Sequence, residues 1–319
     1  MANHLISEIE NGNLKVGDQI SSVNQFAESL KISKSTVMAG LKYLSEKGII
    51  ESVYRKGYFI KSSNIENSYK IFFLMDQLTV FKEELYSSFF NAVKHKATID
   101  VFFHNYNEEL FEKLILDNLN NYTHFVIVPN LKTEKSELLN QIPAKKRIIL
   151  DFRYDNLEGD YGLVYQDFQI DIYLALSQME ERLQKYKRLI LVSPSTAFYS
   201  KFVKDGITKF AKKQQLEFEL TNSVGCFEIK ANDCFITLNR NDRDDVDLIK
   251  FTIANKFELG KEIGLLSYND FYYKEILGGG ISVISTNYKE MGNLAAEMIL
   301  TNAMFKIRNN SILHIRKSI

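Results

Sequence analysis

Basic and hydroxyl-bearing side chains gather near the N-terminus in a pattern that suits contact with nucleic-acid phosphates. Between Lys31 and Lys61 the sequence holds seven basic residues against two acidic ones, an excess of five. Lysines and arginines that bind duplex DNA release its condensed counterions, which drives association. Ser33, Ser35 and Thr36 stand at the start of a predicted helix, where hydroxyls and the helix dipole favour phosphate oxygens. This part of the chain is therefore predicted to face DNA.

A second set of polar side chains follows apolar runs in the remainder of the chain. Ligands of doubly wound folds bind at the carboxyl ends of strands, so a ligand site is expected at these positions. A polyhydroxylated ligand needs a directional partner for each hydroxyl, and a sugar ring presents an apolar face to an aromatic side chain. For each residue, capping of the next helix is the structural alternative. The residues predicted to bind ligand are Asp76, Gln77, Phe81, Asp151, Arg153, Tyr199, Asn239, Arg240 and Asn269.

Three helices and a hairpin are predicted to position the DNA-facing residues. Apolar spacing predicts helices over 4–10 and 22–30 and a third that ends at Gly48, with Ser21 or Ser22 and then Ser33 as N-caps. Short strands are predicted at 49–54 and 58–60, joined by the basic tip Arg55-Lys56-Gly57. Helix, tight turn, helix and basic hairpin is the order of a winged helix-turn-helix. A small helical adaptor whose lysines only solvate its surface is the alternative.

This region resembles the GntR family of bacterial repressors, because its turns, caps and core positions agree together. The resemblance is carried by Gly12 to Ser22, Phe26 to Glu28, Ile32 to Val37, Leu41 to Leu44 and Lys47 to Ile50. It implies that a recognition helix and a wing tip contact operator DNA through Ser33, Lys34, Ser35, Thr36, Lys42, Tyr54, Arg55, Lys56 and Gly57. The chain departs from the family's usual residues at Ser21, Asn24, Met38 and Arg55.

The remainder of the chain alternates apolar runs with amphipathic segments, which is typical of parallel sheets covered by helices on both faces. Strands are predicted at 71–75, 100–103, 125–128, 147–150, 188–192, 234–238 and 262–266, and helices at 85–94, 110–119 and 171–183. The length suits two doubly wound lobes. The predicted organisation is an α/β protein with a winged-helix DNA-binding domain at 1–62, a linker at 63–68 and a two-lobed effector domain at 69–319.

The larger part resembles the LacI-type effector domain, which has the type I periplasmic sugar-binding fold. The resemblance is carried by Asp167 after Leu163 to Tyr165, by Gly264 to Asp270, by Ile281 to Ser285, by Met291-Gly292 and Ala295-Ala296, and by a closing strand from Ile312 to Ser318. It implies a homodimer with contacts through the helices at 85–93 and 294–305, and core packing is the alternative explanation of their apolar residues. The family's ligand-binding arginine would fall at Val203, so Lys201 or Lys204 is expected to act in its place.

Composition and the remaining motifs point away from several classes of protein. The 40 basic and 40 acidic residues cancel, which argues against a wholly basic nucleic-acid coat. Only two cysteines occur, and neither a secretory leader nor a run of about 18 apolar residues is visible, so a cytoplasmic protein is expected. The histidines lack metal-ligand spacing, and the glycine run at 278–280 lacks the lysine of a phosphate loop. No cofactor, metal or catalytic activity is expected.

Together these patterns predict a transcriptional regulator that binds double-stranded operator DNA as a homodimer. A small sugar between the two lobes is expected to control it, and a repressor of a carbohydrate-utilisation operon is expected. One alternative is the same architecture with a nucleobase or an amino acid as ligand, which Val203 favours. The larger part would also suit a doubly wound enzyme or a solute-binding protein, and the attached winged helix speaks against the second of these.

Overall fold

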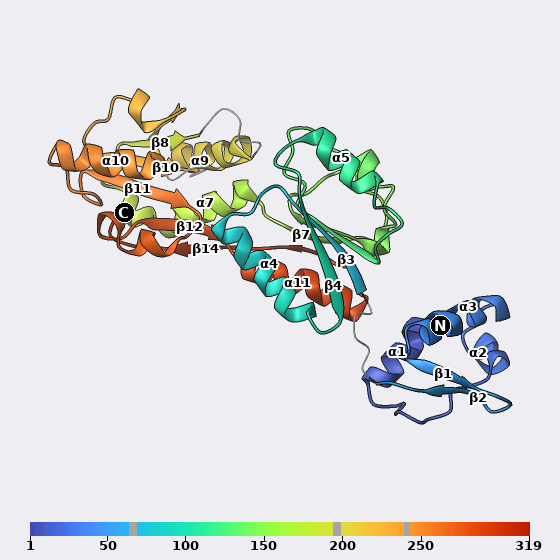
Figure 1. The fold of residues 1–319 in the computed structure, drawn as a ribbon. Helices are drawn as coiled ribbons and strands as arrows, with labels where there is room; N and C mark the ends of the chain where they lie inside the picture. The colour runs from blue at the N-terminus through green and yellow to red at the C-terminus, as the bar shows by residue number, and fades with distance from the viewer. Residues whose placement is uncertain (64–68, 194–198, 239–242) are drawn as a thin grey trace. The chain divides into compact units, whose positions relative to one another are not determined.

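The computed structural model describes residues 1–63, 69–193, 199–238 and 243–319 (Figure 1). The chain divides into two compact units, Met1–Tyr69 with His95–Ala97, and Lys70–Lys94 with Thr98–Ile319. Of the linker predicted at 63–68, all but Ser63 lies outside the described residues.

The N-terminal unit is a three-helix bundle with a hairpin. Its elements are α1 (Ala2–Glu10), α2 (Val23–Ser29), α3 (Lys34–Glu46), β1 (Ile50–Val53) and β2 (Gly57–Ile60). Ser22 caps α2 in a capping box, and the hydroxyl of Ser33 caps α3, because each accepts a hydrogen bond from a backbone N–H of the first turn. Val37, Leu41 and Leu44 are fully buried against residues of α1, α2 and the hairpin. The predicted order of a winged helix-turn-helix is thus present.

The hairpin of this unit is extended by the segment before α2. Strands β1 and β2 pair antiparallel, with Ile50 opposite Ile60 and Val53 opposite Gly57. The Ile20 amide donates to the Tyr58 carbonyl oxygen at 3.0 Å, so the chain before α2 runs along β2. At the tip, Arg55 has a φ of +63° and Gly57 a φ of +100°, which lets the backbone reverse within three residues.

The larger unit holds two six-stranded sheets. The first has the order β13-β7-β6-β5-β3-β4 and the second the order β14-β12-β11-β10-β8-β9. The strands of the first are β3 (Tyr69–Met75), β4 (Ala97–Phe103), β5 (His124–Ile127), β6 (Arg147–Asp151), β7 (Gly162–Tyr165) and β13 (Lys306–Arg308). Those of the second are β8 (Arg188–Val192), β9 (Glu217–Thr221), β10 (Asp233–Thr237), β11 (Ile263–Tyr268), β12 (Ser282–Thr286) and β14 (Ser311–His314). The predicted doubly wound, two-lobed α/β fold is confirmed.

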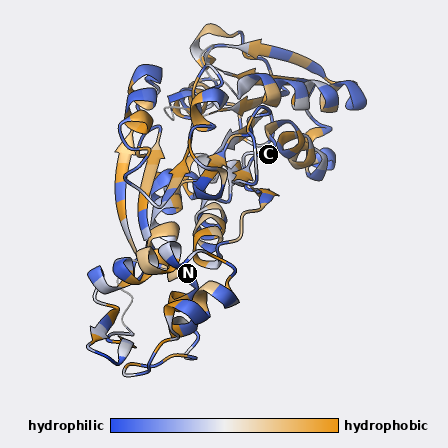
Figure 2. Ribbon diagram, turned by 90° about the vertical axis from the view of Figure 1, so that its right-hand side faces the viewer, coloured by the Kyte–Doolittle hydropathy of each residue, from blue (hydrophilic) through white to orange (hydrophobic). Residues whose placement is uncertain are grey.

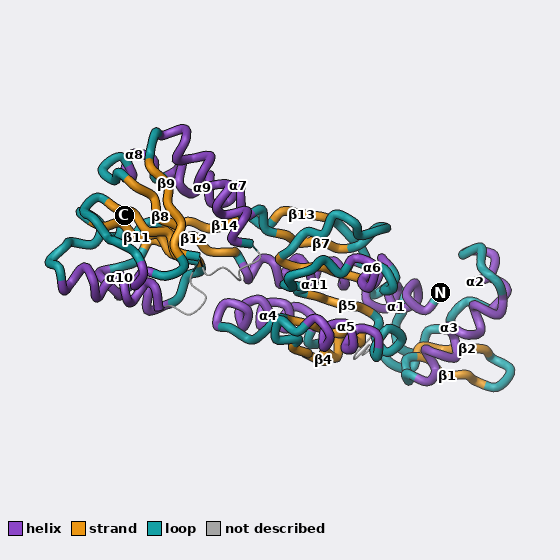
Figure 3. The backbone as a smooth tube through the Cα atoms, turned by 90° about the horizontal axis from the view of Figure 1, so that it is seen from above, coloured by secondary structure: helices purple, strands orange, loops and turns teal. Residues whose placement is uncertain are grey.

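Helices cover both faces of each sheet. They are α4 (Val80–Val93), α5 (Glu108–Leu116), α6 (Ser136–Leu139), α7 (Phe168–Gln178), α8 (Glu180–Leu183), α9 (Ser200–Gln214), α10 (Arg243–Ala254) and α11 (Tyr288–Thr301). In the second lobe α7 and α9 lie on one side of the sheet and α10 on the other, and each side has its own buried core (Figure 3). The helices carry hydrophobic residues on part of their surface and hydrophilic residues on the rest (Figure 2).

The chain passes between the lobes three times. It leaves the first sheet after β7, returns after β12 through α11 to β13, and passes again from β13 to β14. Strand β14 pairs antiparallel with β12, while the other strand pairs of known register in both sheets are parallel. The prediction that the closing strand extends to Ser318 is wrong at its C-terminal end, because β14 ends at His314. Beyond it, Arg316 forms an ion pair with Asp270, with an Nη2–Oδ2 distance of 2.7 Å.

Helices α4 and α11, the expected dimer helices, pack closely against each other within the chain. A Cβ added at Gly292 of α11 would lie 2.4 Å from the Leu85 carbonyl oxygen, so only glycine permits this approach. Leu85, Phe89 and Val93 of α4 are fully buried. Much of their apolar character is therefore explained by this intrachain contact, while Val80 and Phe90 remain exposed.

Candidate DNA-binding surface and effector pocket

The first turn of α3 is ordered by hydroxyl groups. The Ser33 hydroxyl accepts the Thr36 amide at 3.1 Å and lies 2.8 Å from the hydroxyl oxygens of both Ser35 and Thr36. Ser33 therefore has a structural role as the N-cap, in addition to the DNA contact predicted for it. Ser35 and Thr36 are exposed. Backbone N–H groups in the first turn of a helix favour an anion such as a phosphate oxygen.

The basic side chains of the N-terminal unit are solvent-exposed on α3 and on the wing. Lys34 and Lys42 are exposed on α3, and Lys42 lies 3.8 Å from Glu46, which offsets part of its charge. On the wing, the Arg55 guanidinium lies 5.0 Å from the centre of the Tyr54 ring, and Tyr54 is 82% exposed. Lys56 and Gly57 complete the tip, where the Gln19 amide donates to the Lys56 carbonyl oxygen. The cationic groups and the Tyr54 ring are therefore solvent-exposed within this unit.

A cavity of about 300 Å³ opens at the carboxyl ends of strands from both sheets of the larger unit. Strands β3, β6 and β7 supply Asp76, Asp151 and Gln166 from the first lobe, and β11 and β12 supply Tyr268 and Thr286 from the second. This is the edge of a doubly wound sheet at which ligands bind. Six of the predicted ligand residues line the cavity: Asp76, Gln77, Phe81, Asp151, Tyr199 and Asn269.

The other predicted ligand residues that the structure describes do not line this cavity. Arg153 is exposed, lines a neighbouring cavity and lies over the Tyr165 ring at 5.9 Å. Lys201 and Lys204 are exposed on α9, and neither is among the described residues that line the cavity. Val203 is fully buried in the core between α7 and α9, which makes it a packing residue. Asn239 and Arg240 lie outside the described residues.

Asp76 and Lys82 form a buried ion pair at one wall of the cavity. The Lys82 ammonium donates to Oδ1 of Asp76, and both side chains are at most 4% exposed. The Asn130 amide donates to Oδ2 of Asp76 at 2.6 Å, so both carboxylate oxygens are satisfied. Burial alone would raise the pKa of Asp76, but the charge and hydrogen bond of Lys82 lower it overall. The Asp76 carboxylate is therefore stabilised in its ionised form by this contact.

Asp151 is the second carboxylate of the cavity and stands in a strained backbone position. It is 4% exposed, has a φ of +75°, and accepts a hydrogen bond from the side-chain amide of Gln166. Gln166 in turn accepts the Thr286 hydroxyl at 2.5 Å. Burial raises the pKa of Asp151, because its lost hydration outweighs the charge of Lys82 and the Gln166 hydrogen bond. A relay of side chains thus joins the cavity to two of the segments that pass between the lobes.

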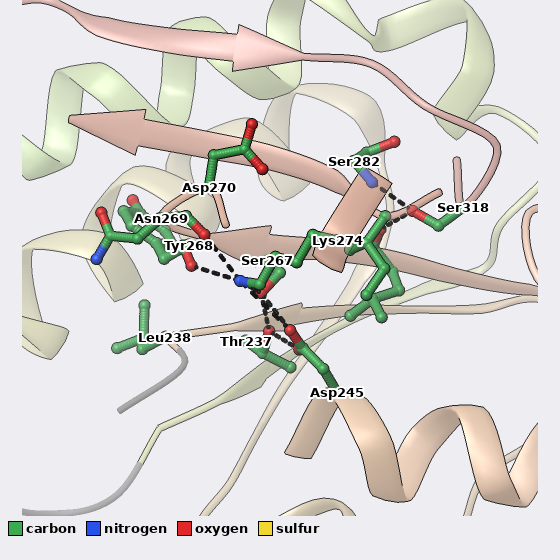
Figure 4. A network of polar contacts seen from close by, with 12 residues as sticks. Thr237, Leu238, Asp245, Ser267, Tyr268, Asn269, Asp270, Lys274, Ser282 and Ser318 are labelled. Carbon is green, nitrogen blue, oxygen red and sulfur yellow. Dashed lines mark hydrogen bonds and ion pairs between the residues drawn. The ribbon is translucent and has the colours of Figure 1, made fainter. Parts of the chain in front are cut away.

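A buried polar network fixes the strand ends on the other side of the cavity (Figure 4). The ammonium of Lys274 is fully buried and donates to the carbonyl oxygens of Tyr268 at 3.0 Å and Asn269 at 2.8 Å. Its charge is matched by Asp245 of α10, 3.5 Å away. Asp245 also accepts the hydroxyls of Thr237 at 2.5 Å and Ser267 at 2.6 Å. The network therefore holds Asn269, whose φ is +59°, in the conformation that lines the cavity.

Aromatic rings make up much of the remaining wall. The Phe168 and Tyr199 rings stack with centroids 5.0 Å apart, and the Phe81 and Tyr288 rings with centroids 5.1 Å apart. Paired rings of this kind present flat apolar faces and keep little conformational freedom. Eight aromatic residues line the cavity: Phe81, Tyr106, Phe152, Phe168, Tyr199, Tyr268, Phe271 and Tyr288.

Among the cavity residues that were not predicted from the sequence are Lys82, Asn130, Gln166 and Thr286, although the sequence contains a signal for some of them. Lys82 falls on the same helical stripe as Leu85, Phe89 and Val93, so it is a charged residue on a buried face. Such a lysine needs a buried partner, which here is Asp76. Gln166 and Thr286 end or follow apolar runs in the same way as the residues that were predicted.

With this geometry established, the chain was compared with known proteins. Residues 1–60 match the family described as "Bacterial regulatory proteins, gntR family". Residues 1–60 form a gntR-family helix-turn-helix domain. The HTH-type transcriptional regulator LutR of Bacillus subtilis is 40% identical to this chain over 53 residues, which is 17% of this chain. The match spans 24% of the length of that relative.

The chain is also similar in fold to solved structures of repressors. The trehalose repressor from Escherichia coli matches with a TM-score of 0.64 at 12% identity, over 77% of this chain and 99% of that one. A dimeric Lac repressor that carries a C-terminal deletion and a lysine-to-leucine substitution matches with a TM-score of 0.64 at 11% identity, over 78% of this chain and 98% of that one. At these identities the likeness shows a shared two-lobed fold and no more. None of the described helices is long and apolar enough to cross a membrane.

Proposed function

We propose that this chain is a transcriptional regulator that binds operator DNA through its gntR domain and responds to a small molecule in the cavity between its lobes. The observation that supports this most is the presence, in one chain, of a DNA-binding domain and a two-lobed domain with a lined cavity at its strand ends. A ligand controls DNA binding only if its affinity differs between the DNA-competent and incompetent states. Gln166 and Thr286 line the cavity and lie in segments that connect the two lobes. A ligand in the cavity therefore contacts the connections between the lobes.

For the DNA contacts, we propose the residues predicted from the sequence on α3 and the wing. Their exposure and charge support the proposal, because cations and helix N–H groups on one domain suit phosphate oxygens. The test is fluorescence anisotropy with duplexes from the region upstream of the chain's own gene. Tight binding of one duplex over a scrambled duplex of equal length supports the proposal, and equal weak binding to all of them contradicts it.

For the regulated process, we propose repression of a carbohydrate-utilisation operon with release by ligand. The trehalose repressor of similar fold supports this direction, as do the carboxylate, amide and aromatic groups of the cavity. Addition of pentoses, hexoses and amino sugars to the protein–duplex complex tests it. Release of the duplex by one of them supports the proposal, and tighter binding would make the ligand a co-repressor.

We also propose a homodimer, since two winged helices related by a two-fold axis match an operator with two half-sites. A similar fold occurs in a Lac repressor described as dimeric. The exposed apolar side chains Val80 and Phe90 of α4 are available for such a contact. Light scattering coupled to gel filtration tests the assembly, with a mass near 74 kDa expected from twice the 37.0 kDa of one chain.

A further inference from the structure

The solvent-facing side of α3 has an apolar centre. Val37, Leu41 and Leu44 point into the core of the N-terminal unit, so the opposite side of the helix is open to solvent. On the open side, Met38 is 46% exposed and Ala39 is exposed as well. Neither residue of this exposed pair belongs to the core of the unit. Core packing therefore gives no reason for an apolar side chain at either position.

The exposed pair Met38 and Ala39 lies between two of the residues proposed to contact DNA. Ser35 and Lys42 are separated by about two helical turns, so both lie on one side of α3, about 10 Å apart along its axis. The exposed pair occupies the turn between them, because spacings of three and four residues bring side chains to one face of a helix. A duplex that contacts both Ser35 and Lys42 therefore also covers the exposed pair.

The polar side chains of this face lie on either side of the exposed pair. The hydroxyl oxygens of Ser33 and Ser35 lie 2.8 Å apart in the first turn, and Lys42 lies 3.8 Å from Glu46 further along the helix. The exposed pair itself carries no hydrogen-bond donor, and a methionine sulfur is only a weak acceptor. These two side chains therefore cannot read a base edge by a conventional hydrogen bond.

The four bases differ in what they offer to an apolar side chain in the major groove. Guanine and adenine present hydrogen-bonding groups there, cytosine presents an amino group, and thymine adds a C5 methyl group. An apolar side chain over a polar edge removes water from it without replacing the hydrogen bonds, which is unfavourable. Contact between a methionine and a methyl group instead buries apolar surface on both partners. Thymine is therefore the base that suits the centre of this face.

We infer that Met38, together with Ala39, is a specificity-determining residue that contacts the C5 methyl group of a thymine in each operator half-site. The inference rests on the proposed function, in that it takes α3 as the helix that contacts DNA. It adds the reading of a base to contacts that otherwise suit phosphate oxygens. The chemical class that it selects is a 5-methylpyrimidine in the major groove.

Replacement of thymine by deoxyuridine in the preferred upstream duplex tests the inference, because it removes the methyl group and keeps the base pairing. Each thymine of the half-sites is replaced in turn, and the Kd of the full chain is measured by fluorescence anisotropy. At one position the replacement should weaken binding about fourfold in one half-site and about fifteenfold in both, as expected for loss of one buried methyl group per protomer. At that position a pair of 5-methylcytosine with guanine should bind about fourfold more tightly than a pair of cytosine with guanine.

Variants of Met38 assign the methyl contact to this side chain. Met38→Ala should reduce each deoxyuridine effect to less than about twofold, whereas Met38→Leu should keep the effects because leucine is also apolar. Both variants should fold as the wild type does, since Met38 is exposed. Val16→Ala is the matched control, because Val16 is 56% exposed in a turn of the same unit and lies outside α3. It should leave the Kd and the deoxyuridine effects unchanged.

The outcomes also distinguish this inference from the proposed function. A chain that prefers no duplex would overturn both. A preferred duplex that has no thymine in its half-sites, or that responds less than about twofold to deoxyuridine at every position, would keep the proposed function and overturn the inference. Equal deoxyuridine effects in wild type and Met38→Ala would also overturn it, because another residue would then read the methyl group.

Discussion

Replacement of Lys274 by methionine tests the network that holds the second-lobe side of the cavity. The variant keeps the length of the side chain but removes an ammonium that is fully buried and satisfies two backbone carbonyl oxygens. Asp245, 1% exposed, then loses the positive charge 3.5 Å away. Breaking a buried ion pair by removal of one partner costs about 3–5 kcal/mol, which is a large share of the stability of a typical domain.

Urea unfolding followed by circular dichroism measures this cost. Lys274→Met should lower the free energy of unfolding of the larger unit by about 3–5 kcal/mol, whereas Lys250→Met, at an exposed site on α10, should change it by less than about 0.5 kcal/mol. The double variant Lys274→Met with Asp245→Asn should recover about 2 kcal/mol, because it removes the unpaired charge while the asparagine side chain still accepts one hydroxyl and can donate to the other hydroxyl oxygen. A loss below about 1 kcal/mol for Lys274→Met, or a double variant no more stable than the single one, would refute the reasoning.

Three further predictions concern other parts of the chain. Replacement of Lys34 and Lys56 by alanine should reduce the slope of log affinity against log salt for the operator by about 4 in the proposed dimer, because each of the two protomers loses two cations, and an unchanged slope would remove both residues from the contact. Burial lowers the pKa of His124 from 6.5 to about 4, so the neutral form is favoured in the folded state and stability is lost as the pH falls from 6.5 toward 4. His124→Phe should remove up to about 3 kcal/mol of that loss in urea unfolding at pH 7 and pH 4.5, and an identical pH profile in the variant would contradict this assignment. Val203→Arg should lower the free energy of unfolding by at least about 3 kcal/mol and not create a ligand contact, because Val203 is fully buried; a stable variant with altered ligand affinity would contradict the packing role.

The N-terminal domain could be predicted almost completely because its signals are local. Serine caps, apolar spacing and a glycine after α3 determine where its helices begin and end within a few residues. The strand-helix alternation of the larger unit is also a local pattern, and it predicted two doubly wound lobes correctly. Errors occurred where tertiary contacts decide, as at Arg316, whose ion pair with Asp270 lies beyond the end of β14.

The cavity could be predicted in part, because strand ends are visible in a sequence and their partners are not. Asp76, Asp151 and Asn269 were found from the apolar runs before them. Nothing in the sequence shows that Lys82 reaches Asp76 or that Lys274 reaches the carbonyl oxygen of Asn269, since those contacts depend on how helices pack on the sheet. The orientation of α9 depends on packing in the same way, and it leaves Lys201 and Lys204, the expected substitutes for the family arginine, exposed to solvent.

The central claim is that a small molecule in the cavity controls binding of DNA by the gntR domain. The most direct measurement is the Kd of the full chain for its preferred upstream duplex, by fluorescence anisotropy, with and without the ligand that raises its Tm. The account predicts a change of at least about tenfold in this Kd when the ligand is bound. The same Kd for wild type with and without a bound ligand would contradict it.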